Sequence, residues 1–510
     1  MPIPSALTAA RRAHNLHRLA QGWRPDVLVV GAGFTGVGIA LDAATRGLSV
    51  AVVDRADLAS GTSCWSSKLV HGGLRYLAKG DVALAHESAV ERGILMQWVA
   101  PHLTRSLPFV TPLNSGVPMS TRVLSGVGYV AGNVLRVAAG TSSSTLTGPR
   151  FVGPGRTREL MPAVAREGLR GAWVNTDGQL VDDARLVVAI ARTAAAFGAA
   201  VLPYTSAADV TGDRVTLTDV VSGESFQARA GRIVVAAGVW SDTLDSRVSL
   251  RPSKGVHLVI DGAVLGHPTA ALTAPVPGHR SRFVFLLPQP DGRVYLGLTD
   301  DPVQGGVQDH PQVGEGERDW LLGVANRVLD QPLTPADVIG SYAGYRPLVA
   351  GTPGRSALAT ADLSRAHVVL DEGEGPITIV GGKLTTYRRM AADVVDRLTP
   401  APCVTARQPL VGALPRRRLA ALAQQPWLVG RYGGEAADVQ SLIQADPALG
   451  EPVVPGLPYL QAEMVFSIQR EGALTAEDLV DRRTRIGLVT ADRVPALEVA
   501  RRLLDQNMPG

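Results

Sequence analysis

The sequence predicts an α/β protein in which a Rossmann-like nucleotide-binding domain is combined with a sheet-rich domain and a helical C-terminal domain. Three observations lead to this prediction. With 510 residues, the chain is too long for one ordinary domain. The apolar run Asp26–Gly31 leads into Gly31-Ala-Gly-Phe-Thr-Gly36, which has the glycine spacing of a dinucleotide-binding turn. After Pro400 the chain consists largely of amphipathic helical segments.

The first βαβ unit follows a polar helical lead-in over residues 1–24. Asp26–Gly31 is a short apolar run of the kind that forms a buried parallel strand. A helix is expected to continue to about Arg46, where Gly47 would end it. Leu48–Asp54 is then the second strand of the unit.

The later elements follow from the same patterns of hydrophobicity and turn residues. They are a helix followed by a strand over Val181–Leu202, two antiparallel strands over Val210–Ala230, buried strands at Arg232–Gly238 and Pro376–Gly382, short strands at Phe283–Leu287 and Val294–Leu298, a helix from about Leu384, and C-terminal helices at Arg416–Gln425, Glu435–Gln444 and Ala491–Leu504. We therefore expect a lead-in helix in 1–24, a nucleotide-binding domain with an interleaved substrate domain in 25–400, and a helical domain in 401–510.

Composition excludes several classes of protein. A net charge of only +4 argues against a nucleic-acid partner. Two cysteines, Cys64 and Cys403, cannot form a disulfide framework or a zinc cluster. We therefore expect a protein without a metal ion that resides in the reducing environment of the cytoplasm. No signal peptide is recognisable near the N-terminus. The apolar stretch Val123–Ala139 is interrupted by Asn133 and Arg136, so no membrane-spanning helix is expected.

The glycine motif predicts a bound dinucleotide. Gly31 would permit the tight turn, Gly33 would let the backbone approach a pyrophosphate, and Gly36 would allow close packing of helix and strand. The amides at the helix N-terminus supply an anion site. Asp54 ends the second strand, 18 residues after Gly36, where a carboxylate accepts hydrogen bonds from an adenosine ribose.

Two other segments favour FAD over NAD as the dinucleotide. The strand ends Ala236–Gly238 and Gly381–Thr386 carry small residues, and the second opens a helix. Its N-terminal dipole, together with Lys383, would stabilise the negative charge that develops when flavin N5 accepts hydride. In Gly61–Tyr76, hydroxyls would bind phosphate and ribitol oxygens, and Gly72 and Gly73 would let the backbone pass close to the flavin ring; a solvated loop is the alternative.

The segment Gly61–Tyr76 resembles the loop Thr-Ser-x-x-Ser-Ser-Lys-Leu-x-His-Gly-Gly-Leu-Arg-Tyr-Leu of the FAD-dependent glycerol-3-phosphate dehydrogenases, although Cys64-Trp65 stands where small residues are commoner. Further similar stretches are Val181–Leu186, Gly344–Leu348, Leu363–His367, Gly381–Tyr387 and Asp478–Leu488. The resemblance covers nearly the whole chain after residue 24. It implies an FAD-binding Rossmann-like domain with a sheet-rich substrate domain and a helical C-terminal domain.

The resemblance also implies an activity. It is the oxidation of sn-glycerol 3-phosphate to dihydroxyacetone phosphate, with hydride passing from substrate C2 to FAD N5 and electrons leaving for a membrane quinone. Arg346 and Arg365 match phosphate-binding positions, and His257 is the candidate base, with a structural histidine as the alternative. The implied catalytic residues are His257, Arg75 and Lys383, and the substrate-binding residues are Arg75, Tyr76, Lys254, His257, Arg346, Arg365 and Lys383.

The implied FAD site is larger. Its residues are Gly31, Gly33, Phe34, Thr35, Gly36, Asp54, Arg55, Thr62, Ser63, Ser66, Ser67, Lys68, His71, Gly72, Gly73, Ala237, Gly238, Trp240, Gly382, Lys383, Leu384 and Thr385. We expect FAD to be held non-covalently, with His71 as the residue to watch for covalent attachment. An oxidase that passes electrons to oxygen and a flavin-binding scaffold without turnover are the competing functions; an NAD-linked enzyme fits these segments less well.

A quinone acceptor implies peripheral association with the cytoplasmic membrane, and we also consider a homodimer. The candidate surface is a helix over Val123–Ala139. Its apolar face would comprise Leu124, Val127, Val130, Val134, Leu135 and Ala138. A helix that caps the protein core is the alternative for this segment.

Overall fold

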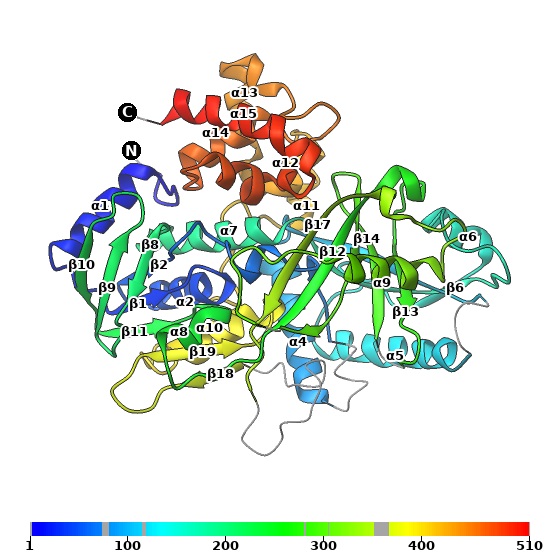
Figure 1. Ribbon diagram of the computed structural model, residues 1–510, viewed down its shortest axis with the longest axis horizontal. Coiled ribbons are helices and arrows are strands. Elements are labelled where there is room, and N and C mark those ends of the chain that lie inside the picture. Colours follow the sequence, from blue (N-terminus) through cyan, green and yellow to red (C-terminus); the bar gives the residue numbers. More distant parts are fainter. Residues whose placement is uncertain are drawn as a thin grey trace.

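The computed structural model describes residues 3–73, 81–114, 119–279, 282–303, 305–350 and 367–508. These residues form a parallel sheet, a larger antiparallel-rich sheet and a layer of C-terminal helices (Figure 1). The predicted α/β class and its three structural parts are confirmed. The division of the chain at residues 24 and 400 stays a prediction.

The parallel sheet has the strand order β18-β19-β11-β1-β2-β7. Its strands are β1 (Val27–Val30), β2 (Val50–Val53), β7 (Ala200–Leu202), β11 (Arg232–Val235), β19 (Ile377–Gly381) and the antiparallel edge strand β18 (His367–Leu370). Central β1 pairs with both β2 and β11 in parallel, so Val29 lies between Val52 and Val234. The carboxyl ends of β1, β2, β11 and β19 therefore meet at one edge of the sheet.

Both faces of this sheet are covered, which explains its continuous apolar strands. On one face, Val27 and Val29 pack with helices α2 (Phe34–Thr45), α7 (Asp183–Ala196) and α10 (Tyr387–Val395). On the other, Leu28 and Val30 pack with helix α1 and the meander of β8, β9 and β10, as Figure 1 shows. These elements are α1 (Ala9–Ala20), β8 (Thr205–Ala208), β9 (Arg214–Asp219) and β10 (Ser225–Arg229).

The second sheet follows the path β16-β12-β15-β14-β13-β4-β6-β3, with β17 beside β12 and β5 beside β6. Its strands are β3 (Leu69–Val70), β4 (Thr104–Pro112), β5 (Arg150–Val152), β6 (Ala172–Leu180), β12 (Ser253–Asp261), β13 (Ala271–Pro275), β14 (Phe283–Pro288), β15 (Arg293–Gly297), β16 (Asp301–Pro302) and β17 (Val338–Arg346). Helix α9 (Glu315–Asn326) packs on one face. The long β12–β17 pair places His257 opposite Tyr342 and runs to Arg346 opposite Ser253.

The C-terminal part contains the helices α12 (Pro426–Tyr432), α13 (Ala436–Ala445), α14 (Gln461–Arg470) and α15 (Thr490–Asn507). The helices expected near Glu435–Gln444 and Ala491–Leu504 are confirmed. The helix expected over Arg416–Gln425 is wrong, because α11 covers only Arg416–Leu419. Gln425 precedes Pro426 and is extended, as steric clash with a following proline requires, so a new helix has to start at Pro426.

Two smaller features complete the fold. The turn after β19 is a short 3-10 segment, Leu384–Thr386, and α10 begins only at Tyr387. Among the residues that the structure describes, no helix has both the length and the apolar character needed to cross a membrane.

Candidate active site

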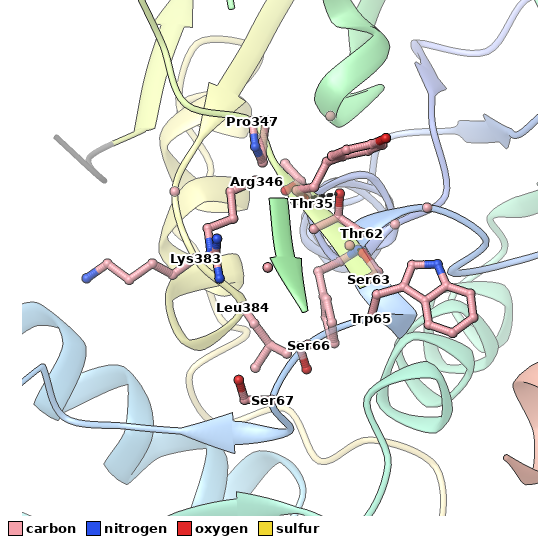
Figure 2. A pocket seen from close by; sticks show the side chains of 18 of the residues that line it. Thr35, Thr62, Ser63, Trp65, Ser66, Ser67, Arg346, Pro347, Lys383 and Leu384 are labelled. Carbon is pink, nitrogen blue, oxygen red and sulfur yellow. Dashed lines mark hydrogen bonds between the residues drawn. The ribbon is translucent and has the colours of Figure 1, made fainter. Parts of the chain in front are cut away.

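A cavity of about 1040 Å³ lies where the parallel sheet meets the second sheet. Its lining includes the strand ends at Gly31, Asp54, Gly238 and Gly382, the loop Ser60–Ser67, and Arg346 at the end of β17. Figure 2 shows the loop side chains, Arg346 and Leu384 around this pocket on separate elements, while the Lys383 side chain extends to the left, away from them. A cavity of this volume is suited to a dinucleotide together with a small substrate.

The turn between β1 and α2 has the geometry of a pyrophosphate cradle. Gly31 has φ of 109° and lies so close to the Ala236 carbonyl that a side chain would clash. Helix α2 starts at Phe34, whose N–H donates to Ser63 Oγ at 3.0 Å, and a Cβ on Gly33 would lie 2.8 Å from that oxygen. Gly33, Phe34 and Thr35 line the cavity, so the helix N-terminus faces it. Gly36 does not line the cavity, but its lack of a side chain allows α2 to approach the Gly31 carbonyl.

Asp54 ends β2 at the same edge. Its carboxylate accepts hydrogen bonds from Ala32 N–H at 2.7 Å and Ala56 N–H at 3.0 Å. Burial raises the pKa of Asp54 to about 6, although both amides favour the ionised form. Arg55, Trp240 and Ala237 line the cavity nearby, and the Arg55 guanidinium carbon lies 4.7 Å from the Trp240 ring centroid.

The loop Thr62–Ser67 lines the cavity, but its hydroxyl groups already have partners. Thr62 donates to the Tyr345 carbonyl at 2.7 Å, and Ser66 donates to Asp183 at 2.7 Å. Ser67 Oγ lies 2.8 Å from His257 Nε2. These hydroxyls therefore fix the shape of the loop, in addition to any contact with a cofactor.

Besides Gly36, three residues expected at the cofactor do not line the cavity. Lys68 is only 1% exposed, and its Nζ lies 3.1 Å from Asp183, beneath the loop. Gly72 lies against the Arg92 guanidinium and donates its N–H to Asp177 at 3.3 Å. Gly73 also lies outside the lining, whereas His71 is part of it. Lys68 and Gly72 thus lie behind the residues that line the cavity and help to fix their positions.

The turn after β19 brings Gly382, Lys383, Leu384 and Thr385 to the cavity. Gly381 and Gly382 have φ of 82° and 76°, a backbone conformation that favours glycine. Lys383 Nζ donates to Ser88 Oγ at 2.8 Å, on helix α4 (Val82–Ile94), and this contact orients its side chain.

His257 lies on the substrate side of the cavity, stacked on Tyr342 with ring centroids 4.6 Å apart. Burial, with the charges of Lys68 and Arg346, holds the pKa of His257 well below its ordinary value. The lowered pKa favours the neutral form of the imidazole. A side chain at Gly297, opposite on β15, would clash with the ring.

Arg346 is oriented by three groups. Its Nη1 lies 3.2 Å from both Ser253 Oγ and Asp300 Oδ1, and its Nη2 donates to the Thr299 carbonyl at 3.0 Å. Thr299 and Asp300 also line the cavity. Sequence reasoning missed them, because Leu298–Asp301 carries no distinctive motif.

Lys254 is not brought to the cavity. Its ammonium pairs with Glu317 at 2.8 Å and donates to the Gln312 carbonyl at 3.1 Å, on the outer side of β12. Alternation along a strand sends Lys254 and Gly255 to opposite faces, and it is Gly255 that lines the cavity. The predicted ligands Arg75, Tyr76 and Arg365 lie outside the described residues.

Comparison with known proteins agrees with this site. Residues 26–388 match the FAD dependent oxidoreductase family, and residues 403–506 match the C-terminal domain of alpha-glycerophosphate oxidase. Glycerol-3-phosphate dehydrogenase 1 of Mycobacterium tuberculosis is 49% identical, with 99% of this chain and 100% of the relative covered. Glycerol-3-phosphate dehydrogenase of Synechocystis is 32% identical over 92% of this chain and 90% of the relative.

Among solved structures, the glycerol-3-phosphate dehydrogenase of Bacillus halodurans in complex with FAD superposes with a TM-score of 0.73 at 27% identity. The match covers 98% of this chain and 94% of that one. Fold and site thus define an FAD-dependent oxidoreductase. More specifically, the chain belongs to the family of FAD-dependent glycerol-3-phosphate dehydrogenases.

The residues present fit FAD. The helix α2 N-terminus and Asp54 suit its diphosphate and adenosine ribose, and the turn at Gly382 leaves room for a ring. When bound, FAD supplies a two-electron acceptor at this position.

Asp54→Asn should stabilise the FAD-free protein while weakening FAD binding. Burial raises the pKa of Asp54 from 3.8 to about 6. The unfolded state therefore loses its proton at lower pH than the folded state, and the folded state loses stability as the pH rises from about 4 to 6. A rise of this size corresponds to roughly 3 kcal/mol at most, less the hydrogen bond that the amide loses. The stability advantage of the variant should therefore grow between about pH 4 and 6 and then stay constant. Urea unfolding from pH 4 to 8 measures it, and an advantage independent of pH would contradict the assignment.

Proposed function

We propose that this protein oxidises sn-glycerol 3-phosphate to dihydroxyacetone phosphate and passes the electrons to a membrane quinone. The observation that carries the proposal is that Arg346, His257 and Lys383 all line the cavity that holds the FAD cradle. The curated relatives that match almost the whole chain bear the name glycerol-3-phosphate dehydrogenase, which supports the same substrate.

Arg346 is the residue that we assign to the substrate phosphate. Its planar fork suits a phosphate dianion, and the contacts to Ser253, Asp300 and Thr299 fix its direction before substrate arrives. Fixed orientation reduces the entropy that binding would otherwise lose.

His257 is the residue that we assign as base. Its Nε2 lies 2.8 Å from the Ser67 hydroxyl, and its lowered pKa favours the neutral ring, which is the form that a base must have before it takes the proton of the substrate hydroxyl. Stacking on Tyr342 fixes the plane of the ring. Lys383, held by Ser88 beside the glycine turn, adds positive charge where negative charge develops.

Arg346→Ala should lower kcat/KM for glycerol 3-phosphate by about 30- to 1000-fold, corresponding to roughly 2–4 kcal/mol of lost charge-assisted binding. Glycerol, which lacks the phosphate, should distinguish little between variant and parent. Arg166→Ala is the control, because that arginine forms an exposed ion pair with Asp330 at 3.2 Å. Steady-state kinetics with both substrates provide the measurement, and an unchanged kcat/KM for glycerol 3-phosphate would refute the assignment.

The membrane part of the proposal rests on helix α5 (Met119–Ala138). Its side chains Val130, Val134 and Val137 are 55%, 63% and 61% exposed and follow helical spacing along one stripe. A neighbouring side of the helix packs inward, where Tyr129 hydrogen-bonds to Thr111 at 2.6 Å. In Figure 1, α5 lies on the side of the molecule opposite to α13 and α15. Of the predicted apolar face, the side chains of Leu124 and Val127 lie outside the described residues.

The double change Val130→Glu and Val134→Glu should weaken binding to anionic liposomes by about tenfold, because two charges would enter the interfacial layer. Flavin reduction by substrate should be unaffected. Val494→Glu is the matched control, since Val494 is 60% exposed on α15, away from α5. Vesicle co-sedimentation tests this expectation; if both proteins bind liposomes like the parent, the membrane surface lies elsewhere.

An oxidase is the second candidate, since the C-terminal family is named for alpha-glycerophosphate oxidase. Hydrogen peroxide formed in air without added quinone distinguishes the two functions. One peroxide per substrate oxidised would favour the oxidase.

A further inference from the structure

A buried acid pair lies directly beneath the loop that lines the cavity. Asp182 and Asp183, at the start of α7, are 1% and 0% exposed. Asp183 accepts hydrogen bonds from the Ser66 N–H at 3.0 Å, the Ser66 hydroxyl at 2.7 Å and Lys68 Nζ at 3.1 Å. The carboxylate therefore anchors the loop from below, on the side away from the cavity.

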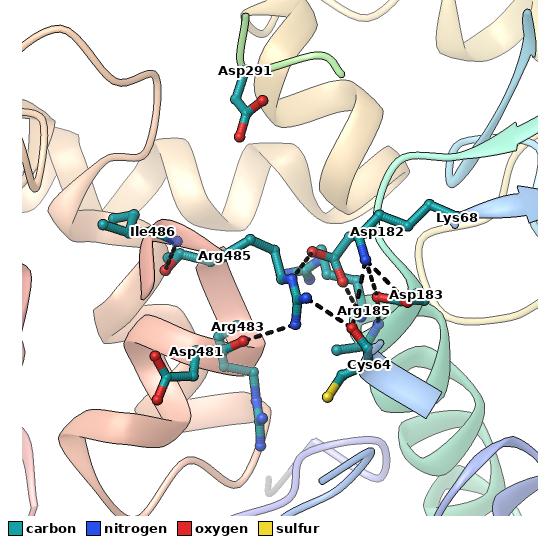
Figure 3. Close-up of polar contacts among 12 residues, drawn as sticks. Cys64, Lys68, Asp182, Asp183, Arg185, Asp291, Asp481, Arg483, Arg485 and Ile486 are labelled. Carbon is teal, nitrogen blue, oxygen red and sulfur yellow. Dashed lines mark hydrogen bonds and ion pairs between the residues drawn. The ribbon is translucent and has the colours of Figure 1, made fainter. Parts of the chain in front are cut away.

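The C-terminal domain contributes a cation to the same place. Arg485 is 2% exposed, and Figure 3 shows its side chain reaching from the C-terminal segment toward Asp182 and Cys64. Its Nη2 donates to the Cys64 carbonyl at 2.7 Å, and its Nε lies 3.8 Å from Asp182. A third contact, from Nη1 to the Asp481 carbonyl at 2.9 Å, ties the guanidinium to its own segment.

The backbone of Arg485 is held in an unusual conformation for this contact. Its φ is 114°, a region that non-glycine residues rarely adopt, and it ends the helical segment η10 (Asp478–Thr484). The guanidinium carbon also lies 5.2 Å from the Trp65 ring centroid. Arg485 thus meets the backbone of Cys64 and the ring of Trp65, two consecutive residues of the loop.

Two cations lie beside the two acids, although burial raises the pKa of Asp182. Lys68 and Arg485 supply two positive charges to Asp182 and Asp183. Although burial opposes ionisation, Lys68 and Arg485 hold the pKa of Asp183 below its ordinary value. Removing one cation would leave a buried carboxylate uncompensated, which is strongly unfavourable.

We propose that Arg485 is a positioning residue for the cavity loop Thr62–Lys68, so that docking of the C-terminal helical domain completes the active site. Contacts on both sides of the loop connect the C-terminal domain to the cavity. Arg485 bonds to Cys64 and Asp183 bonds to Ser66, while Ser67 bonds to His257 in the cavity wall. From the other side, Tyr342 donates its hydroxyl to the Ser66 carbonyl at 3.0 Å. A shift of the loop would therefore move the partner of the proposed base.

Other buried arginines connect the C-terminal domain to the rest of the chain without touching this loop. Arg483 pairs with Asp57 at 2.7 Å, and Arg185 on α7 pairs with Glu471 at 2.6 Å. Within the described part of the chain, Arg485 is the one C-terminal residue that donates a hydrogen bond to Thr62–Lys68. The positioning role is therefore specific to Arg485 and differs from general attachment of the domain.

The test compares Arg485→Gln with Arg431→Gln in the full-length protein. Arg431 is equally buried and pairs with Glu463 at 2.7 Å, but inside the C-terminal domain. Hydrogen exchange of a peptide covering residues 61–69 and the dissociation constant of FAD are measured first. Arg485→Gln should speed exchange in that peptide and weaken FAD binding, each about tenfold. Arg431→Gln should lower the melting temperature but leave both quantities within twofold of the parent, and Arg485→Lys should restore part of each.

The kinetic arm rests on the proposed function. At saturating FAD, Arg485→Gln should lower kcat for flavin reduction by about tenfold with KM within twofold, because Arg346 is untouched. If glycerol 3-phosphate fails to reduce the flavin of the parent, the proposed function fails, while exchange and FAD affinity still decide the role of Arg485. Parent-like exchange and FAD affinity in Arg485→Gln would overturn the proposal. If that variant does not fold, Asp182→Asn decides by the same two measurements and the same outcomes.

Discussion

The parallel pairing of β1 between β2 and β11 is the constraint on which the rest of the site depends. It brings Gly31, Asp54 and Gly238 to one edge of one sheet, although more than 200 residues separate the first from the last. Because parallel strands end at the same edge, a dinucleotide can contact several turns at once. Residues of the second sheet, Arg346 and His257, then close the substrate side of the same cavity.

The loop Thr62–Lys68 connects the nucleotide-binding part to the second sheet through hydrogen bonds. On one side its hydroxyls contact the α2 N-terminus and His257, and on the other it rests on Asp183 and Arg485. Buried charged groups of this kind are strongly destabilising when one partner is removed. The loop is therefore fixed by groups from the nucleotide-binding part, the second sheet and the C-terminal helices.

Local sequence patterns predict much of the fold, whereas contacts between residues far apart in the sequence could not be predicted. The βαβ unit and its glycines could be predicted because turn chemistry and strand hydrophobicity are local properties. The helix expected over Arg416–Gln425 ends at Leu419, and the proline that requires an extended Gln425 was overlooked. Lys254 was expected at the substrate, but its partner Glu317 lies 63 residues away and has no sequence signature. Likewise, no spacing rule links Ser66 to Asp183 or Cys64 to Arg485.

The proposed function requires that Arg346, His257 and FAD share one cavity in which glycerol 3-phosphate is oxidised. Anaerobic mixing of the FAD-loaded protein with sn-glycerol 3-phosphate tests it most directly, with flavin absorbance as the readout and no electron acceptor present. We expect the flavin band to bleach, with one dihydroxyacetone phosphate formed per flavin. An oxidised flavin spectrum that persists at saturating substrate would contradict it.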